Sequence, residues 1–67
     1  MYVVWVRTDE CLYWITFRND RFILSQSPEE AHQFGDMGNA ESAITIFLDL
    51  AHKLGVSVTC QIERVAA

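Results

Sequence analysis

Nucleophilic catalysis is the first chemistry that the residues of this chain could support. A serine or cysteine nucleophile needs a base such as histidine within reach, and the chain contains several serines, two cysteines and two histidines. None of them lies in a nucleophile elbow, and Ser27 and Cys60 are explained by the helix and strand predicted around them. An active site also needs a cleft, which so short a chain rarely encloses. We therefore predict no catalytic residue and no enzymatic activity.

Metal and phosphate sites each require a residue spacing that this chain does not have. The two cysteines and two histidines would make a Cys2His2 zinc set, but they show no CxxC or HxxxH spacing. Gly35 and Gly38 form a GxxG sequence that no predicted strand precedes and no lysine follows, unlike a phosphate-binding loop. The sequence predicts no metal and no cofactor, and Cys11 and Cys60 are expected to be free thiols.

The acidic residues are concentrated in the segment 27–50, which contains five carboxylates and no Lys or Arg. The rest of the chain has four acids and five bases, so this segment accounts for the net charge of −4. A surface of one sign attracts the opposite sign, and we therefore predict that these carboxylates bind a basic protein partner. The residues predicted to bind the partner are Glu29, Glu30, Asp36, Glu41 and Asp49. The same net charge would repel a polyanion, so direct binding of nucleic acid is not predicted.

Length and composition predict one globular domain over residues 1–67. A hydrophobic fraction of 51% is too high for a disordered chain. The chain is near the lower size limit for a core without disulfides or metals. The apolar run 3–6 is far shorter than the about 20 residues of a membrane span, and no basic region of a signal peptide precedes it. We expect a cytoplasmic protein that does not bind membranes.

Three strands are predicted in the first part of the chain, from segments rich in β-branched and aromatic residues. They are 2–7, 11–17 and 21–25. The polar residues between the first two favour a short hairpin loop, and Asn19 and Asp20 tolerate the left-handed backbone of a tight turn. A fourth strand is predicted over 56–63, where apolar and polar residues alternate. Its core-facing residues are predicted to be Val56, Val58, Cys60 and Ile62.

A short helix is predicted over residues 28–34. Ser27 is placed as the N-cap and Pro28 as the first helical residue, and Glu30 completes the pattern of a capping box. Gly35 can take the left-handed conformation that ends a helix. The two glutamates of this segment would lie where the helix dipole favours negative charge.

A long helix is predicted from the N-cap Asn39 to Leu54, with Gly55 as its stop signal. Its apolar residues cover an arc of roughly 200°, which is wider than the ~100° needed to lie on a sheet. Phe47 is at the centre of this arc, so we predict that it inserts between the sheet and the short helix. The wide arc needs a second contact, which is either the short helix, through Ala31 and Phe34, or the surface of a dimer partner or target.

These elements predict an α+β fold, a two-layer sandwich of order βββααβ. Its mainly antiparallel four-stranded sheet would carry one short and one long helix on one face. The predicted spatial order of the strands is 3-2-1-4, with the fourth strand parallel to the first and joined by a right-handed crossover.

The order of a hairpin, the segment SPEEAHQF, the helix AESAITIFLDLAHKLG and a final strand resembles the small accessory proteins of bacteriophages. Among them, the chain is similar in size, acidity and layout to anti-CRISPR proteins. The resemblance implies an inhibitor in the host-cell cytoplasm that docks on a CRISPR effector and blocks recognition of target DNA. Such inhibitors often present carboxylates where phosphates would lie, which fits the acidic segment. The alternative is a small homodimeric interaction or assembly protein without inhibitory or enzymatic activity.

Overall fold

Three consecutive antiparallel strands form the first part of the sheet in the computed structural model, which describes residues 1–65. They are β1 (Tyr2–Arg7), β2 (Leu12–Arg18) and β3 (Arg21–Ser25). The turn between β2 and β3 consists of Asn19 and Asp20, which have φ angles of 55° and 61°. Two central residues with positive φ define the type I′ turn that suits a two-residue hairpin, so the predicted turn is confirmed.

The sheet is completed by β4 (Thr59–Arg64), which pairs with β1 at one edge. The strand order is β3-β2-β1-β4, as predicted. The predicted direction of β4 is wrong, because β4 runs antiparallel to β1, with Val6 opposite Cys60. The described residues thus form a four-stranded sheet that is antiparallel throughout, and no right-handed crossover between parallel strands is present.

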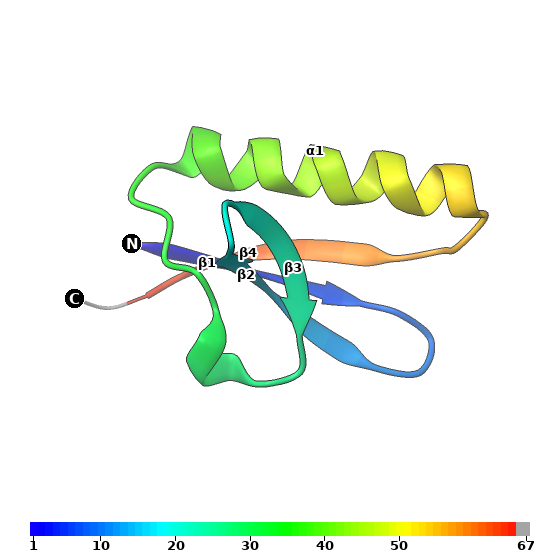
Figure 1. Cartoon of the computed structure of the whole chain (residues 1–67), viewed down its shortest axis with the longest axis horizontal. Helices are drawn as coiled ribbons and strands as arrows, with labels where there is room; N and C mark the ends of the chain where they lie inside the picture. The colour runs from blue at the N-terminus through cyan, green and yellow to red at the C-terminus, as the bar shows by residue number, and fades with distance from the viewer. Residues whose placement is uncertain (66–67) are drawn as a thin grey trace.

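The long helix α1 (Met37–Leu54) packs on one face of this sheet, which gives the predicted two-layer α+β architecture (Figure 1). It ends at Gly55, as predicted, in the left-handed conformation with φ 71°. Its start differs from the prediction. Asp36, and not Asn39, is the N-cap, and its Oδ1 accepts a 2.9 Å hydrogen bond from the Gly38 N–H.

The prediction of a short helix over residues 28–34 is wrong. Only a single 3-10 turn forms, η1 (Pro28–Glu30), and the chain after it continues without helical structure to Phe34. The predicted capping box is also absent, because the Ser27 hydroxyl donates to the Glu29 carboxylate and caps no backbone N–H. Backbone hydrogen bonds to the sheet hold the segment instead, since the His32 N–H donates to the Ile15 carbonyl and Phe34 bridges to Tyr2. These contacts with the sheet outweigh the local helix signal.

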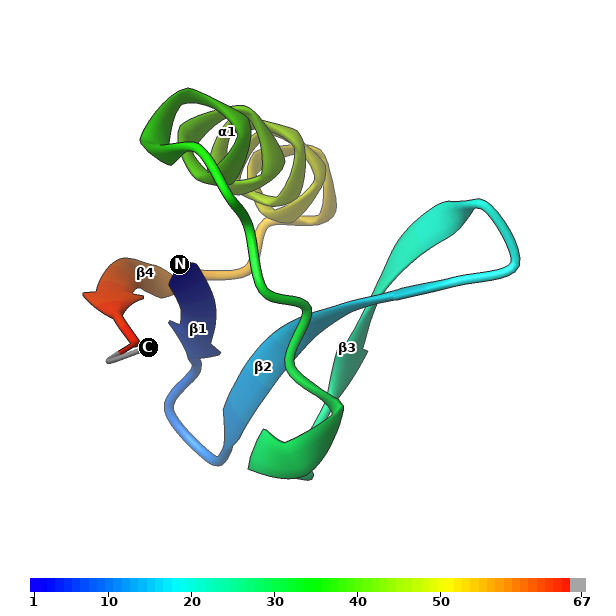
Figure 2. The same cartoon turned by 90° about the vertical axis from the view of Figure 1, so that its left-hand side faces the viewer.

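The path of the chain before α1 explains the direction of β4. The segment from η1 to Phe34 carries the chain back to the start of β1 (Figure 2). The helix α1 then runs in the direction of β1, and β4 returns against it. The prediction of a parallel β4 counted the reversal by one helix only and left out the return of this segment.

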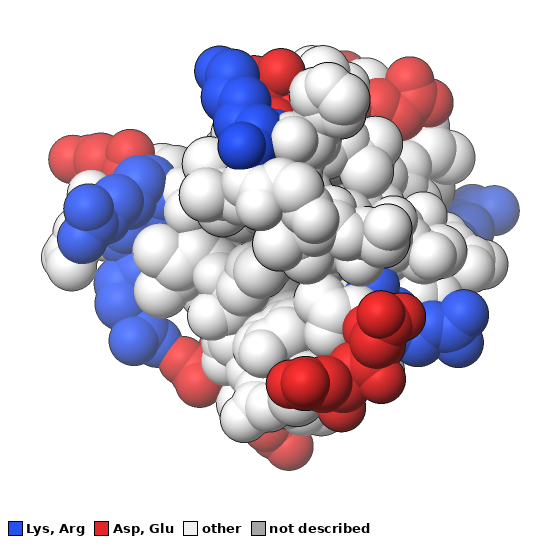
Figure 3. All heavy atoms as spheres, turned by 90° about the vertical axis from the view of Figure 1, so that its right-hand side faces the viewer, with Lys and Arg blue, Asp and Glu red and all other residues white. Residues whose placement is uncertain are grey.

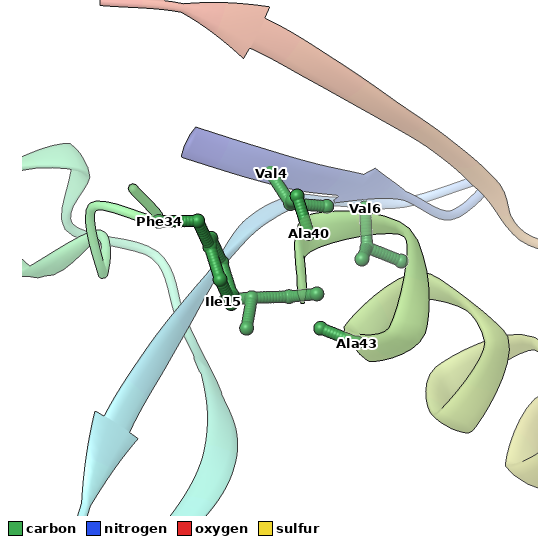
Figure 4. Packing of buried hydrophobic residues seen from close by; sticks show 6 residues of the cluster. All are labelled: Val4, Val6, Ile15, Phe34, Ala40 and Ala43. Atoms are coloured by element: carbon green, nitrogen blue, oxygen red, sulfur yellow. The ribbon is translucent and has the colours of Figure 1, made fainter. Parts of the chain in front are cut away.

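The core lies between α1 and the middle of the sheet, where six buried residues pack together (Figure 4). They are Val4, Val6, Ile15, Phe34, Ala40 and Ala43. The only buried residues of α1 are the two alanines, because close packing on the sheet leaves room for small side chains only. Phe47 is half-buried and packs against this cluster, and because the short helix does not form, the prediction that it inserts between the sheet and that helix is wrong.

The alternation predicted for the fourth strand is confirmed in its second half. Val58, Cys60 and Ile62 pack partly buried against the core cluster, while Thr59 and Gln61 are exposed. Val56 differs from the prediction. It precedes the strand and is 48% exposed.

Candidate interaction groove

An apolar groove lies between α1 and the β2–β3 hairpin. The helix contacts β1 and β4, and the hairpin bends away from it, so that the two diverge (Figure 2). Ten large apolar side chains of residues 1–65 are exposed. Six of them line this groove or its rim, and they are Phe17, Leu24, Ile46, Leu50, Leu54 and Val56.

One end of the groove is a cavity of about 150 Å³ near the C-terminus of α1. Leu50 and Leu54 extend from the helix on one side, and Leu24 lies on the hairpin opposite them. Val6 forms part of the floor and belongs to the core. Because the floor of the cavity is the core itself, a partner side chain placed here would extend the core.

The other end of the groove, near the N-terminal half of α1, is lined by aromatic rings and has a volume of about 290 Å³. Phe17 and Phe22 of the hairpin meet edge to face with 5.1 Å between ring centroids, and the rings of His32 and Phe34 meet edge to face at 4.7 Å. Ile46 closes the helix side. Ring faces and edges of this kind bind apolar or aromatic side chains well.

Charged residues lie at the margins of the groove and not inside it. Lys53 is next to Leu54 on α1, and its Nζ is 3.1 Å from Asp49 in an exposed ion pair. Asp9 and Glu10, in the loop between β1 and β2, share a neighbouring depression with Val56. Figure 3 shows a broad uncharged area with basic and acidic side chains around it.

The five carboxylates predicted to bind a partner come from η1, the N-cap of α1 and α1 itself. Asp49 pairs with Lys53, and Glu30 pairs with Arg18 and accepts a 3.1 Å hydrogen bond from Ser25. Asp36 caps α1. These three therefore have partners within the chain.

Within residues 1–65, Glu29 and Glu41 are the two predicted carboxylates that neither form an ion pair nor cap α1. The hydrogen bond from Ser27 lowers the pKa of Glu29, so this carboxylate stays ionised at neutral pH. Glu29 is on η1 and Glu41 is on the outer side of α1, so the two lie on different elements.

Two half-buried tryptophans lie on the sheet face opposite α1. Trp5 is opposite Trp14 in the register of β1 and β2, and its Nε1 donates a 2.9 Å hydrogen bond to Glu63. The Arg7 guanidinium is 6.0 Å from the Trp5 ring centroid. The Trp5 N–H already has a hydrogen-bond partner within the chain, so it is not free to bind a polar group of another molecule. The groove is better suited to an apolar partner than this face is to a polar one.

The cysteines are free thiols in the structure. Cys60 is half-buried under α1, and this burial raises the pKa of its thiol. A raised pKa leaves little thiolate at neutral pH, which suits a packing residue rather than a nucleophile. Within the described chain, no group of three or more His, Cys, Asp or Glu side chains is placed to hold a metal ion.

Comparison with known proteins found no matching family model, no matching curated protein and no matching solved structure. The described part of the chain contains no helix with the length and apolar character needed to cross a membrane.

The sequence indicated one wall of this groove and missed the other. The wide apolar arc of the long helix predicted that a second contact was needed, and Leu50 and Leu54 belong to that arc. The hairpin wall, with Phe17, Phe22 and Leu24, was not predicted. The alternation of side chains along a strand could have indicated this wall, because it places these three residues on the same face of the sheet as Ile15.

Proposed function

We propose that this protein works by binding another protein chain in the groove between α1 and the β2–β3 hairpin. The observation that carries the proposal is the concentration of exposed apolar side chains, six of ten, along this one groove. Exposed apolar side chains that gather on one part of a small domain commonly mark a site where a partner binds.

The two ends of the groove suit different side chains of a partner. The cavity between Leu24, Leu50 and Leu54 fits an aliphatic side chain, and full burial of one such side chain stabilises a complex by about 1.5–3 kcal/mol. The aromatic end beside Phe22 and His32 fits a ring. Two apolar anchors in neighbouring pockets are the usual centre of a protein interface.

A photo-crosslinking amino acid in place of Leu50 tests this proposal in cells of the source organism. We expect a covalent adduct with a protein, because Leu50 is exposed in the groove. The matched control is the same probe in place of Thr45, which is exposed elsewhere on α1 and lines neither cavity. Equal adducts at both positions, or none at Leu50, would contradict the proposal.

A second candidate function is inhibition of a nucleic-acid-binding effector, such as a CRISPR complex, by a carboxylate-rich face. It is supported by Glu29 and Glu41, which are exposed and outside the ion pairs of the described residues. In this case a crosslinker at Glu41 would give the adducts and the one at Leu50 would not. The two candidates therefore predict opposite results in the same experiment.

A further inference from the structure

We infer that the chain that fills the groove is a second copy of this protein, in a twofold-symmetric dimer. The inference rests on the proposed function, because it names the occupant of the groove proposed there. Two properties of the chain support a second copy over an unrelated protein. They are the size of its core and the charges at the groove margins.

The core of one copy is small. Its largest fully buried side chains are Ile15, Val4 and Val6, and α1 adds only Ala40 and Ala43. A single chain of this length rarely gains more than about 3–5 kcal/mol from its core. The large side chains of α1, such as Leu50 and Leu54, lie outside this core at 50% and 69% exposure. A partner that completes the core must be present whenever the chain folds, and a second copy meets this condition.

The charges at the margins are complementary under twofold symmetry. Lys53 lies on the α1 side of the apolar area, and Asp9 and Glu10 lie beyond Val56 on the side of the β1–β2 loop. A twofold contact pairs the same surface on both copies, so a residue at one margin can face the opposite margin of the other copy. Such an arrangement places Lys53 of one copy near Asp9 and Glu10 of the other. Two chains of net charge −4 can approach each other at the uncharged side chains of Leu54 and Val56, which lie next to these charged residues.

The ion pair between Lys53 and Asp49 does not prevent Lys53 from contacting a second copy. Asp49 and Lys53 form an i,i+4 pair whose side chains are 62% and 71% exposed. An exposed pair of this kind contributes only a few tenths of a kcal/mol in a helix. The Lys53 side chain can therefore leave Asp49 and contact Asp9 and Glu10 of a second copy with little loss of stability.

Sedimentation equilibrium of the full chain tests the dimer directly. We expect a species of twice the chain mass of 7.7 kDa at micromolar concentration. Leu50→Asp should raise the dimer Kd by more than about a hundredfold, because it places a charge at the centre of the contact. Leu48→Asp is the matched control, since Leu48 is 43% exposed on α1 but does not line the groove. It should leave the Kd unchanged.

A charge exchange keeps the test valid if Leu50→Asp fails to fold. Lys53→Glu alters only an exposed side chain and should raise the dimer Kd by roughly three- to tenfold. Adding Asp9→Lys and Glu10→Lys to the same chain should restore the Kd toward that of the wild type, because the opposite charges then face each other again. Recovery of the Kd by changes within the same chain is expected only if Lys53 faces Asp9 and Glu10 of a second copy.

The outcomes separate this inference from the proposed function. A wild-type chain that sediments as a 7.7 kDa monomer up to millimolar concentration overturns the dimer. If the crosslinker at Leu50 then joins a different protein, the groove still binds a partner and only the second copy is wrong. If the monomer also gives no adduct at Leu50, both are wrong. A dimer that Leu48→Asp disrupts and Leu50→Asp does not would equally overturn the proposed contact.

Discussion

Tyr2 and Phe34 exchange two backbone hydrogen bonds, from the Tyr2 N–H to the Phe34 carbonyl at 2.8 Å and from the Phe34 N–H to the Tyr2 carbonyl at 2.7 Å. This bridge holds the segment before α1 against the start of β1. The segment therefore contacts the sheet and does not form the helix that we expected to cover the apolar arc of α1.

Phe34→Ala is expected to unfold most of the protein at room temperature. Phe34 is 4% exposed, and its ring packs on Phe22 and His32 at centroid distances of 5.7 and 4.7 Å. Truncation of a buried phenylalanine typically costs about 3–5 kcal/mol, which equals the stability expected for so small a core. A circular dichroism melt of the variant measures the loss.

Phe17→Ala is the matched control for this prediction. Phe17 is a ring of the same size in the same aromatic cluster, but it is 46% exposed. We expect a loss of about 1 kcal/mol, since an exposed ring gives up less apolar burial. If Phe17→Ala destabilises the chain as much as Phe34→Ala, the placement of Phe34 in the core is wrong.

Asp36→Ala is expected to lower the free energy of unfolding by about 1 kcal/mol, because the Asp36 side chain caps α1 through the Gly38 N–H. Asn39→Ala should change it by less than about 0.5 kcal/mol, since Asn39 is exposed within the helix. Urea denaturation of both variants measures the difference. If Asn39→Ala lowers the free energy of unfolding more than Asp36→Ala does, the N-cap is Asn39, as the sequence predicted.

The elements that the sequence predicted correctly have local causes. The turn at Asn19 and Asp20 and the end of α1 at Gly55 depend on residues that tolerate positive φ, and these can be recognised without knowing the fold. The fold class followed from the alternation of the strands and the apolar arc of the helix. What failed was the segment 28–34, where a strong local capping pattern competes with hydrogen bonds to strands β1 and β2.

The candidate site could be predicted only in part, for the same reason. The apolar arc of α1 is a property of one element and was visible in the sequence. Whether the arc is covered depends on residues far away in the chain, such as Phe34 and Leu24. The partners of the acidic residues are equally non-local, since Glu30 pairs with Arg18 on another element. A count of charges along the chain therefore could not show that Glu30 and Asp49 are in ion pairs.

Asp20→Gly is expected to stabilise the β2–β3 hairpin by about 0.5–1 kcal/mol. Asp20 has a φ of 61°, and glycine takes a positive φ without the steric strain of a Cβ. The change would also create the sequence Asn-Gly, which type I′ turns favour most. Thermal unfolding measures the gain. Asp20→Ala serves as the control and should destabilise the protein, because alanine is strained at this φ and lacks the carboxylate. If both variants are more stable than the wild type, the positive φ at Asp20 is wrong.

Cys60 is expected to react with iodoacetamide more slowly in the folded protein at pH 8 than after unfolding in urea. Burial under α1 raises the pKa of the Cys60 thiol above its ordinary value of 9.0, so the folded state holds less of the reactive thiolate. The same shift links folding to pH. The folded state keeps the proton more tightly than the unfolded state, so the stability from this group is fully present below pH 9 and is lost as the pH rises through the folded-state pKa. Mass spectrometry of timed, quenched samples from pH 7 to 10 measures the rate. A Cys60 rate in the folded chain that equals the rate in urea across this range would show that the thiol is not buried in solution.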